Sequence, residues 1–131
     1  MKIKFAALSG LIAALLLACG PVFAHHAWGN YDMSNTTTVK GTVVSFDFGN
    51  PHVWIGFEAK DEKGNLERWD AGGPSPNRME GTGWSQSTLK PGDQITAVGN
   101  RIKDGSRKLR LAKVILSDGK ELLCYGTRYG S

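Results

Sequence analysis

The chain has 131 residues, of which 40% are hydrophobic, and its 16 basic residues exceed its 12 acidic ones for a net charge of +4. This length suits a single domain, and the hydrophobic content excludes a disordered chain. The charge is too small to indicate a nucleic-acid-binding protein, and two cysteines are too few for a disulfide-rich scaffold.

The first 24 residues have the organisation of a secretion signal. Lys2 and Lys4 precede an apolar stretch at residues 5–18, and Val22 and Ala24 occupy the −3 and −1 positions of a cleavage motif. The apolar stretch has about 14 residues, fewer than the roughly 20 needed to span a bilayer, so we expect cleavage. The predicted mature protein begins at His25, is periplasmic or secreted, and keeps no transmembrane segment.

A second processing route starts from the first cysteine. Residues 16–19 resemble a bacterial lipobox, in which Cys19 would be lipidated and become the first residue of an anchored lipoprotein. Cleavage after Ala24 instead leaves Cys124 as the single cysteine, which excludes an internal disulfide. Cys124 is then either a small buried hydrophobe or a thiol for intermolecular or metal bonding.

The first half of the mature chain predicts an arm followed by a β-hairpin. Residues 25–36 lack a period and are expected to form an extended N-terminal arm. Alternation then predicts a strand over residues 39–48, with Thr42, Val44, Phe46 and Phe48 on one face. Residues 49–51 form a turn signal. A second strand over residues 53–60 has an apolar face made of Val53, Ile55, Phe57 and Ala59.

The second half predicts three more strands and one short helix. A strand at residues 66–71 follows a polar turn, and residues 75–80 suit a helical turn with Pro76 near its first position. Residues 89–93 suit a type II turn, with Pro91 and Gly92 at its centre. Strands at 94–100 and 107–116 follow, and residues 121–124 predict a final short hairpin arm.

The order of these elements predicts an all-β fold. Three strands, a connection that carries a short helix, and two more strands are the arrangement of an OB-like five-stranded barrel. An open β-sandwich of similar strand count is the alternative. Residues 37–131 are therefore expected to form a single domain behind the arm at 25–36.

Several short motifs resemble, in their order, a family of small secreted bacterial domains of unknown function. They are His-His at 25–26, Gly-Thr-Val at 41–43, Asn-Pro-His at 50–52, Gly-Trp at 83–84 and Leu-Lys-Pro-Gly-Asp at 89–93. The chain departs from that pattern after His26, where Ala27-Trp28 stands in place of Ser-Phe. The resemblance implies secretion and a small β-barrel, and it implies no activity. Periplasmic OB domains are similar more distantly, through the Gly-Asp before the fourth strand.

All three histidines of the chain are candidate metal ligands. If cleavage follows Ala24, His25 offers an amine and an imidazole, while His26 and His52 offer further imidazoles, and copper is the preferred metal. His52 lies about 30 Å from Val39 along the hairpin, and an extended arm reaches roughly 46 Å, so the arm is long enough to fold back. The alternative is that the histidines are solvated or structural.

A second candidate surface combines an aromatic residue with basic ones. Trp54 lies on the face opposite Val53 and Ile55. Arg107, Lys108 and Arg110 lie in the predicted hairpin of the strands at 94–100 and 107–116. OB barrels bind ligands through such faces. Because the compartment disfavours nucleic acid, an envelope polyanion or a protein partner is the expected ligand. This non-catalytic binding module is the alternative to metal binding.

No enzyme template fits the sequence. It has no nucleophile elbow with a Ser/His/Asp order, no HExxH motif and no Walker-type loop. We therefore do not predict an enzyme, and a catalytic copper centre ranks third among the hypotheses.

Overall fold

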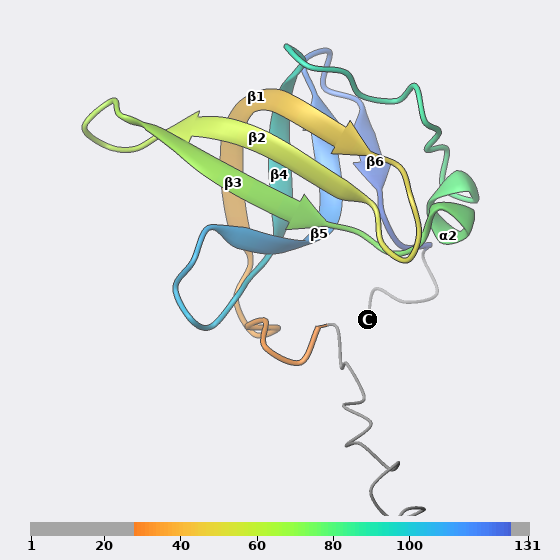
Figure 1. Ribbon diagram of the computed structural model, residues 1–131, viewed down its shortest axis with the longest axis horizontal. Helices are drawn as coiled ribbons and strands as arrows, with labels where there is room; N and C mark the ends of the chain where they lie inside the picture. Colours follow the sequence, from red (N-terminus) through yellow and green to blue (C-terminus); the bar gives the residue numbers. More distant parts are fainter. Residues whose placement is uncertain (1–27, 127–131) are drawn as a thin grey trace, which may run out of the picture.

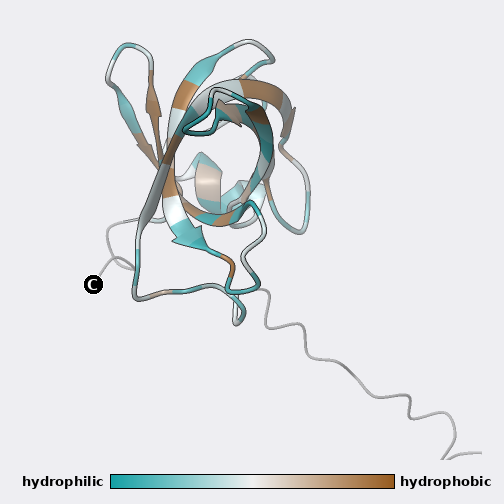
Figure 2. Ribbon diagram, turned by 90° about the vertical axis from the view of Figure 1, so that its left-hand side faces the viewer, coloured by the Kyte–Doolittle hydropathy of each residue, from teal (hydrophilic) through white to brown (hydrophobic). Residues whose placement is uncertain are grey.

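The computed structural model of the chain describes residues 28–126 and contains a closed five-stranded β-barrel. Its strands are β1 (Thr37–Asp47), β2 (Trp54–Lys60), β3 (Leu66–Gly72), β4 (Gln94–Arg101) and β5 (Lys108–Leu116). They are hydrogen-bonded in the order β3-β2-β1-β4-β5, and a parallel pairing of β3 with β5 closes the ring (Figures 1 and 2). A sixth strand, β6 (Glu121–Leu123), extends β5 as a short hairpin.

This architecture confirms the predicted OB-like barrel and excludes the open sandwich. The short helix α2 (Pro76–Glu80) lies between β3 and β4, where the sequence predicts it, with Ser75 at its N-cap and Pro76 in its first turn. Gly92 has φ +94°, and the Asp93 amide donates to the Lys90 carbonyl at 3.1 Å, as a type II turn requires. No helix within residues 28–126 is long and apolar enough to cross a membrane.

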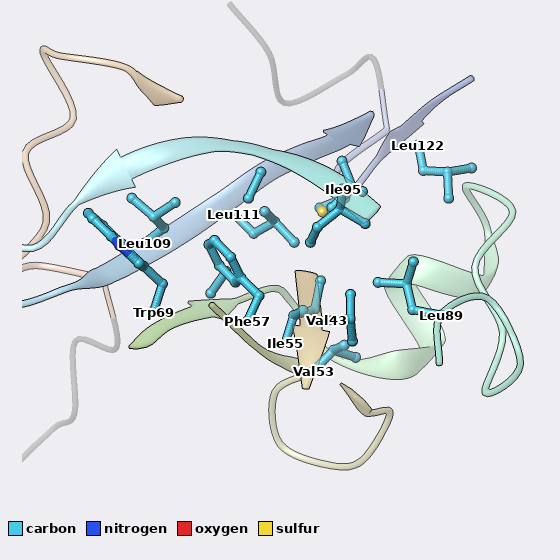
Figure 3. Packing of buried hydrophobic residues seen from close by; sticks show 14 of the residues in the cluster. Val43, Val53, Ile55, Phe57, Trp69, Leu89, Ile95, Leu109, Leu111 and Leu122 are labelled. Atoms are coloured by element: carbon cyan, nitrogen blue, oxygen red, sulfur yellow. The ribbon is translucent and has the colours of Figure 1, made fainter. Parts of the chain in front are cut away.

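The core consists mainly of the inward residues of β2, β3, β4 and β5 (Figure 3). The predicted apolar face of β2 is confirmed, because Val53, Ile55 and Phe57 are fully buried and Ala59 is nearly so. The Phe57 ring stacks on Trp69 of β3 with centroids 6.4 Å apart. Met79 of α2 is also fully buried in this core, so the helix packs directly on the barrel.

The prediction of which residues of β1 point inward was wrong for the first half of the strand. Val43 is buried and Val44 is 39% exposed, whereas Phe46 and Phe48 pack against the core as expected. The pairing of β1 with β2 shifts register between Val43 and Ser45, which marks a β-bulge. A bulge adds one residue to one strand, so the alternation that holds at Phe46 is inverted before it.

Candidate functional site

Barrel closure places three residues from separate strands in one row on the outer surface. Trp54 of β2 is opposite Gly72 of β3, and Gly72 is opposite Arg110 of β5. Gly72 has no side chain, and two indole rings occupy the space above it. A Cβ added there would lie 2.8 Å from the Trp54 ring and 3.1 Å from the Trp28 ring. Both indoles therefore lie over Gly72, and Trp28 comes from the N-terminal arm.

The arm is attached to the barrel by backbone hydrogen bonds. The Asp32 amide donates to the Arg101 carbonyl at 2.8 Å, and the Lys103 amide donates to the Asn30 carbonyl at 2.8 Å. Tyr31 forms an isolated β-bridge with Ile102 and is 6% exposed. The segment at residues 28–36 thus lies along the end of the β4–β5 hairpin before β1 begins (Figure 1).

A small polar cluster supports the turn that leads from the arm into β1. The Asp32 carboxylate accepts hydrogen bonds from the Asn35 amide group at 2.7 Å and from the Ser34 hydroxyl. These bonds, with that from Asn35 the largest contribution, lower the pKa of Asp32 to about 2. The Asn100 side chain also donates to the Asn35 carbonyl at 3.0 Å, which connects the turn to β4.

Trp28 contacts the one predicted metal ligand that the structure describes. Its ring lies edge-on to the His52 ring with centroids 5.1 Å apart, and edge-on to Tyr31 at 5.4 Å. Such perpendicular arrangements are favoured by the quadrupoles of aromatic rings. The start of the described arm therefore reaches the tip of the β1–β2 hairpin, as the reach of the arm allows.

The His52 side chain has an unsatisfied nitrogen. It follows a cis Asn50–Pro51 peptide bond and is half-buried, and its Nδ1 atom is buried without a hydrogen-bond partner among the described residues. A buried polar atom left unpaired costs about 1–3 kcal/mol. His52 thus has a ring nitrogen that a ligand or another part of the chain would stabilise.

A cavity of about 400 Å³ opens beside His52. Its walls come from the arm, the β1–β2 loop, the segment around α2, β5 and the residues after β6: Trp28, Pro51, His52, Pro74, Ser75, Arg78, Arg110 and Tyr125. The Arg110 guanidinium lies 4.4 Å from the centroid of the Tyr125 ring and 5.9 Å from that of Trp28. Burial raises the pKa of Tyr125, and the charge of Arg110 opposes that rise.

The other two predicted ligands, His25 and His26, are outside the described residues. Within residues 28–126, no three histidine, cysteine, aspartate or glutamate side chains form a group that could hold a metal ion. Cys124 is fully buried in the core, and burial raises the pKa of its thiol, so it is placed as a small core residue. A site with three such ligands at His52 would therefore need ligands from outside the described residues.

The three basic residues of the second predicted surface have different surroundings in the fold. Arg107 forms an ion pair with Glu67 at 2.8 Å, and Lys108 is opposite Asp70 in the β3–β5 pairing. Arg110 instead lines the cavity, in the same row as Trp54. The structure thus brings Trp54 and Arg110 of the second predicted surface close to His52 of the first.

Sequence reasoning missed four contributors to this site: Trp28, Gly72, Arg78 and Tyr125. Trp28 stands two residues after His26, and that adjacency was a usable signal. Gly72 ends a strand whose register against Trp54 was not predicted. Arg78 and Tyr125 come from the helix and from the segment after the last strand, and they meet only in the folded chain.

Comparison with known proteins identifies one family. Residues 13–110 match the group described as "Family of unknown function (DUF6152)". The comparisons with curated proteins and with solved structures found no match. Because the match covers most of the chain, including the barrel from β1 into β5, the chain belongs to this family of unknown function.

Proposed function

We propose that this protein is a secreted β-barrel that binds copper through His25, His26 and His52. In this proposal the first 24 residues are removed on export, and His25 becomes the N-terminus. His25 then ligates through its α-amine and its ring, and His26 and His52 add imidazoles.

The observation that carries the proposal is the contact between Trp28 and His52, with ring centroids 5.1 Å apart. His26 precedes Trp28 by two residues, so its Cα lies within about 7 Å of the Trp28 Cα, and that of His25 lies within about 11 Å. Both histidines are therefore within covalent reach of the hairpin tip that carries His52. If the N-terminal arm ran away from His52, the structure would not support this proposal.

The ligand chemistry suits copper. Neutral imidazole binds late first-row metals, and Cu(II) binds most tightly among the divalent ions. An α-amine has a reference pKa of about 8, so a metal can displace its proton near neutrality. A metal at Nδ1 of His52 would also satisfy a buried nitrogen that has no partner among the described residues.

The test is native mass spectrometry of protein exported through its own first 24 residues, before and after Cu(II) addition. We expect a mass that begins at His25 and one tightly held copper ion. His52→Ala should weaken copper binding by at least about tenfold, because even the loss of a residue that only supports a metal ligand typically costs about 10–100-fold. The matched control is Asn77→Ala, a substitution at an exposed position of α2 that should leave the affinity unchanged.

Two results would contradict the proposal. One is a chain that begins at a lipidated Cys19, because His25 would then be internal and lack its amine. The other is a chain that begins at His25 but binds copper with the same affinity before and after the His52→Ala substitution.

The second candidate function is a non-catalytic binding module of the cell envelope. It is favoured by Arg110, which lines the cavity and lies in the same cross-strand row as Trp54. Metal stoichiometry separates the two, since this module needs no copper. A catalytic copper centre ranks third, and oxidant-dependent turnover would identify it.

A further inference from the structure

We propose that the cavity beside His52 binds a small organic oxyanion, whose carboxylate or phosphate group is held by Arg78 and Arg110. This site requires no metal, so it goes beyond the copper proposal and can be tested without it.

The partners of the arginines within residues 28–126 distinguish these two from the rest. Arg68 donates to Ser45 and lies 3.7 Å from Asp70, and Arg107 pairs with Glu67. Arg101 donates to the carbonyls of two residues in the β4–β5 turn.

In the same part of the chain, Arg78 and Arg110 donate to no carboxylate and no backbone carbonyl, and both line the cavity. The two guanidiniums without such a partner are therefore the two that share a cavity. Guanidinium groups bind carboxylates and phosphates in a planar, bidentate geometry, so an oxyanion is the ligand they suit.

The remaining cavity walls also favour an anion. None of the lining residues is acidic. Ser75 contributes a hydroxyl that makes no capping hydrogen bond to α2, so this donor is available to a ligand. The described walls therefore combine two cations and a free hydroxyl, with no carboxylate to compete for them.

Arg110 is held in place before any ligand arrives. Its guanidinium lies over the rings of Tyr125 at 4.4 Å and Trp28 at 5.9 Å. These contacts reduce the rotamer freedom that the side chain would lose on binding. The cavity volume of about 400 Å³ is within the range of sites for small organic molecules.

The experiment is an NMR titration of the metal-free, exported protein with inorganic phosphate in one series and succinate in another, at low and constant ionic strength. We expect saturable shifts of the Arg110 side-chain and Trp28 indole signals at millimolar concentrations. The probe that binds more tightly identifies the preferred head group.

Two variants and a control complete the test. Arg78 is exposed on α2. Arg78→Gln should weaken anion binding by about tenfold, which is the effect of losing one charge-assisted contact. Arg110→Gln should have a similar effect. Lys60→Gln removes one charge at the far end of β2 and should leave binding unchanged.

Non-saturable shifts with both probes would overturn the proposal, and so would an equal loss of binding in Arg78→Gln and Lys60→Gln. Because no copper is present, this result is independent of the outcome for the metal site.

Discussion

Replacing Trp28 with alanine should release the N-terminal arm from His52 and weaken copper binding. The indole makes two edge contacts with aromatic rings, at 5.1 Å to His52 and 5.4 Å to Tyr31, and lies 5.9 Å from the Arg110 guanidinium. Aromatic pairs contribute about 0.5–1.5 kcal/mol each and a cation–π contact about 0.5–1 kcal/mol. Because Trp28 is half-buried, we take the lower part of this range, about 2 kcal/mol for docking of the arm.

A docking energy of about 2 kcal/mol corresponds to a weakening of copper affinity by up to about 30-fold. The assay is a calorimetric Cu(II) titration of four exported proteins: wild type, Trp28→Ala, His52→Ala and the double variant. If Trp28 acts by holding the arm near His52, its substitution should have little effect once His52 is absent. The two substitutions should therefore be strongly non-additive. Trp28→Phe keeps an aromatic ring and should lose less affinity.

The reasoning would be refuted by additive effects of the two substitutions. It would equally be refuted by a Trp28→Ala protein that binds copper as tightly as wild type and remains sensitive to His52→Ala. Either result would mean that the Trp28–His52 contact does not organise the ligands.

Three further predictions concern the same region and the core. Gly72→Val should displace both indoles and destabilise the fold by about 1–3 kcal/mol, measured by urea unfolding with tryptophan fluorescence, since a Cβ would lie 2.8 Å from the Trp54 ring. Asp32 has a pKa of about 2 in the fold against 3.8 ordinarily, so the stability it contributes should be full above about pH 4 and lost as the pH falls toward 2. Asp32→Asn should therefore reduce the loss of unfolding temperature between about pH 4 and pH 2 relative to wild type. Burial raises the pKa of the Cys124 thiol above 9.0, so the stability that the buried thiol contributes to the fold should be full below about pH 9 and be lost at higher pH. The thiol of the native protein should also resist alkylation until the chain unfolds.

Local pattern was sufficient to predict most of the barrel. From just before β2 to its end, every second residue is apolar and buried, namely Val53, Ile55, Phe57 and Ala59, and period-two alternation specifies which face is buried. β1 shows where this reasoning fails. Its bulge lies between Val43 and Ser45, inside a run in which Val43 and Val44 are equally apolar, so composition could not indicate which of them turns outward.

The candidate site was less predictable, because it depends on pairings between distant strands. The sequence placed His52 at the tip of a hairpin and gave the arm enough length to reach it. The parallel β3–β5 pairing that aligns Gly72 with Arg110 joins residues 38 positions apart. No local pattern encodes that register, so neither the space over Gly72 for Trp28 nor the approach of Arg110 to His52 was foreseen.

The two proposed sites are linked by electrostatics. The Arg110 guanidinium and the His52 ring both lie against Trp28, so they are no more than about 11 Å apart. At an effective dielectric constant of about 20, each pair of unit charges at that separation interacts by about 1.5 kcal/mol, so the guanidinium opposes a divalent cation at His52. An oxyanion between the two arginines would offset this repulsion. Since coupling between two ligands is reciprocal, an anion that strengthens copper binding must itself bind more tightly to the copper-loaded protein.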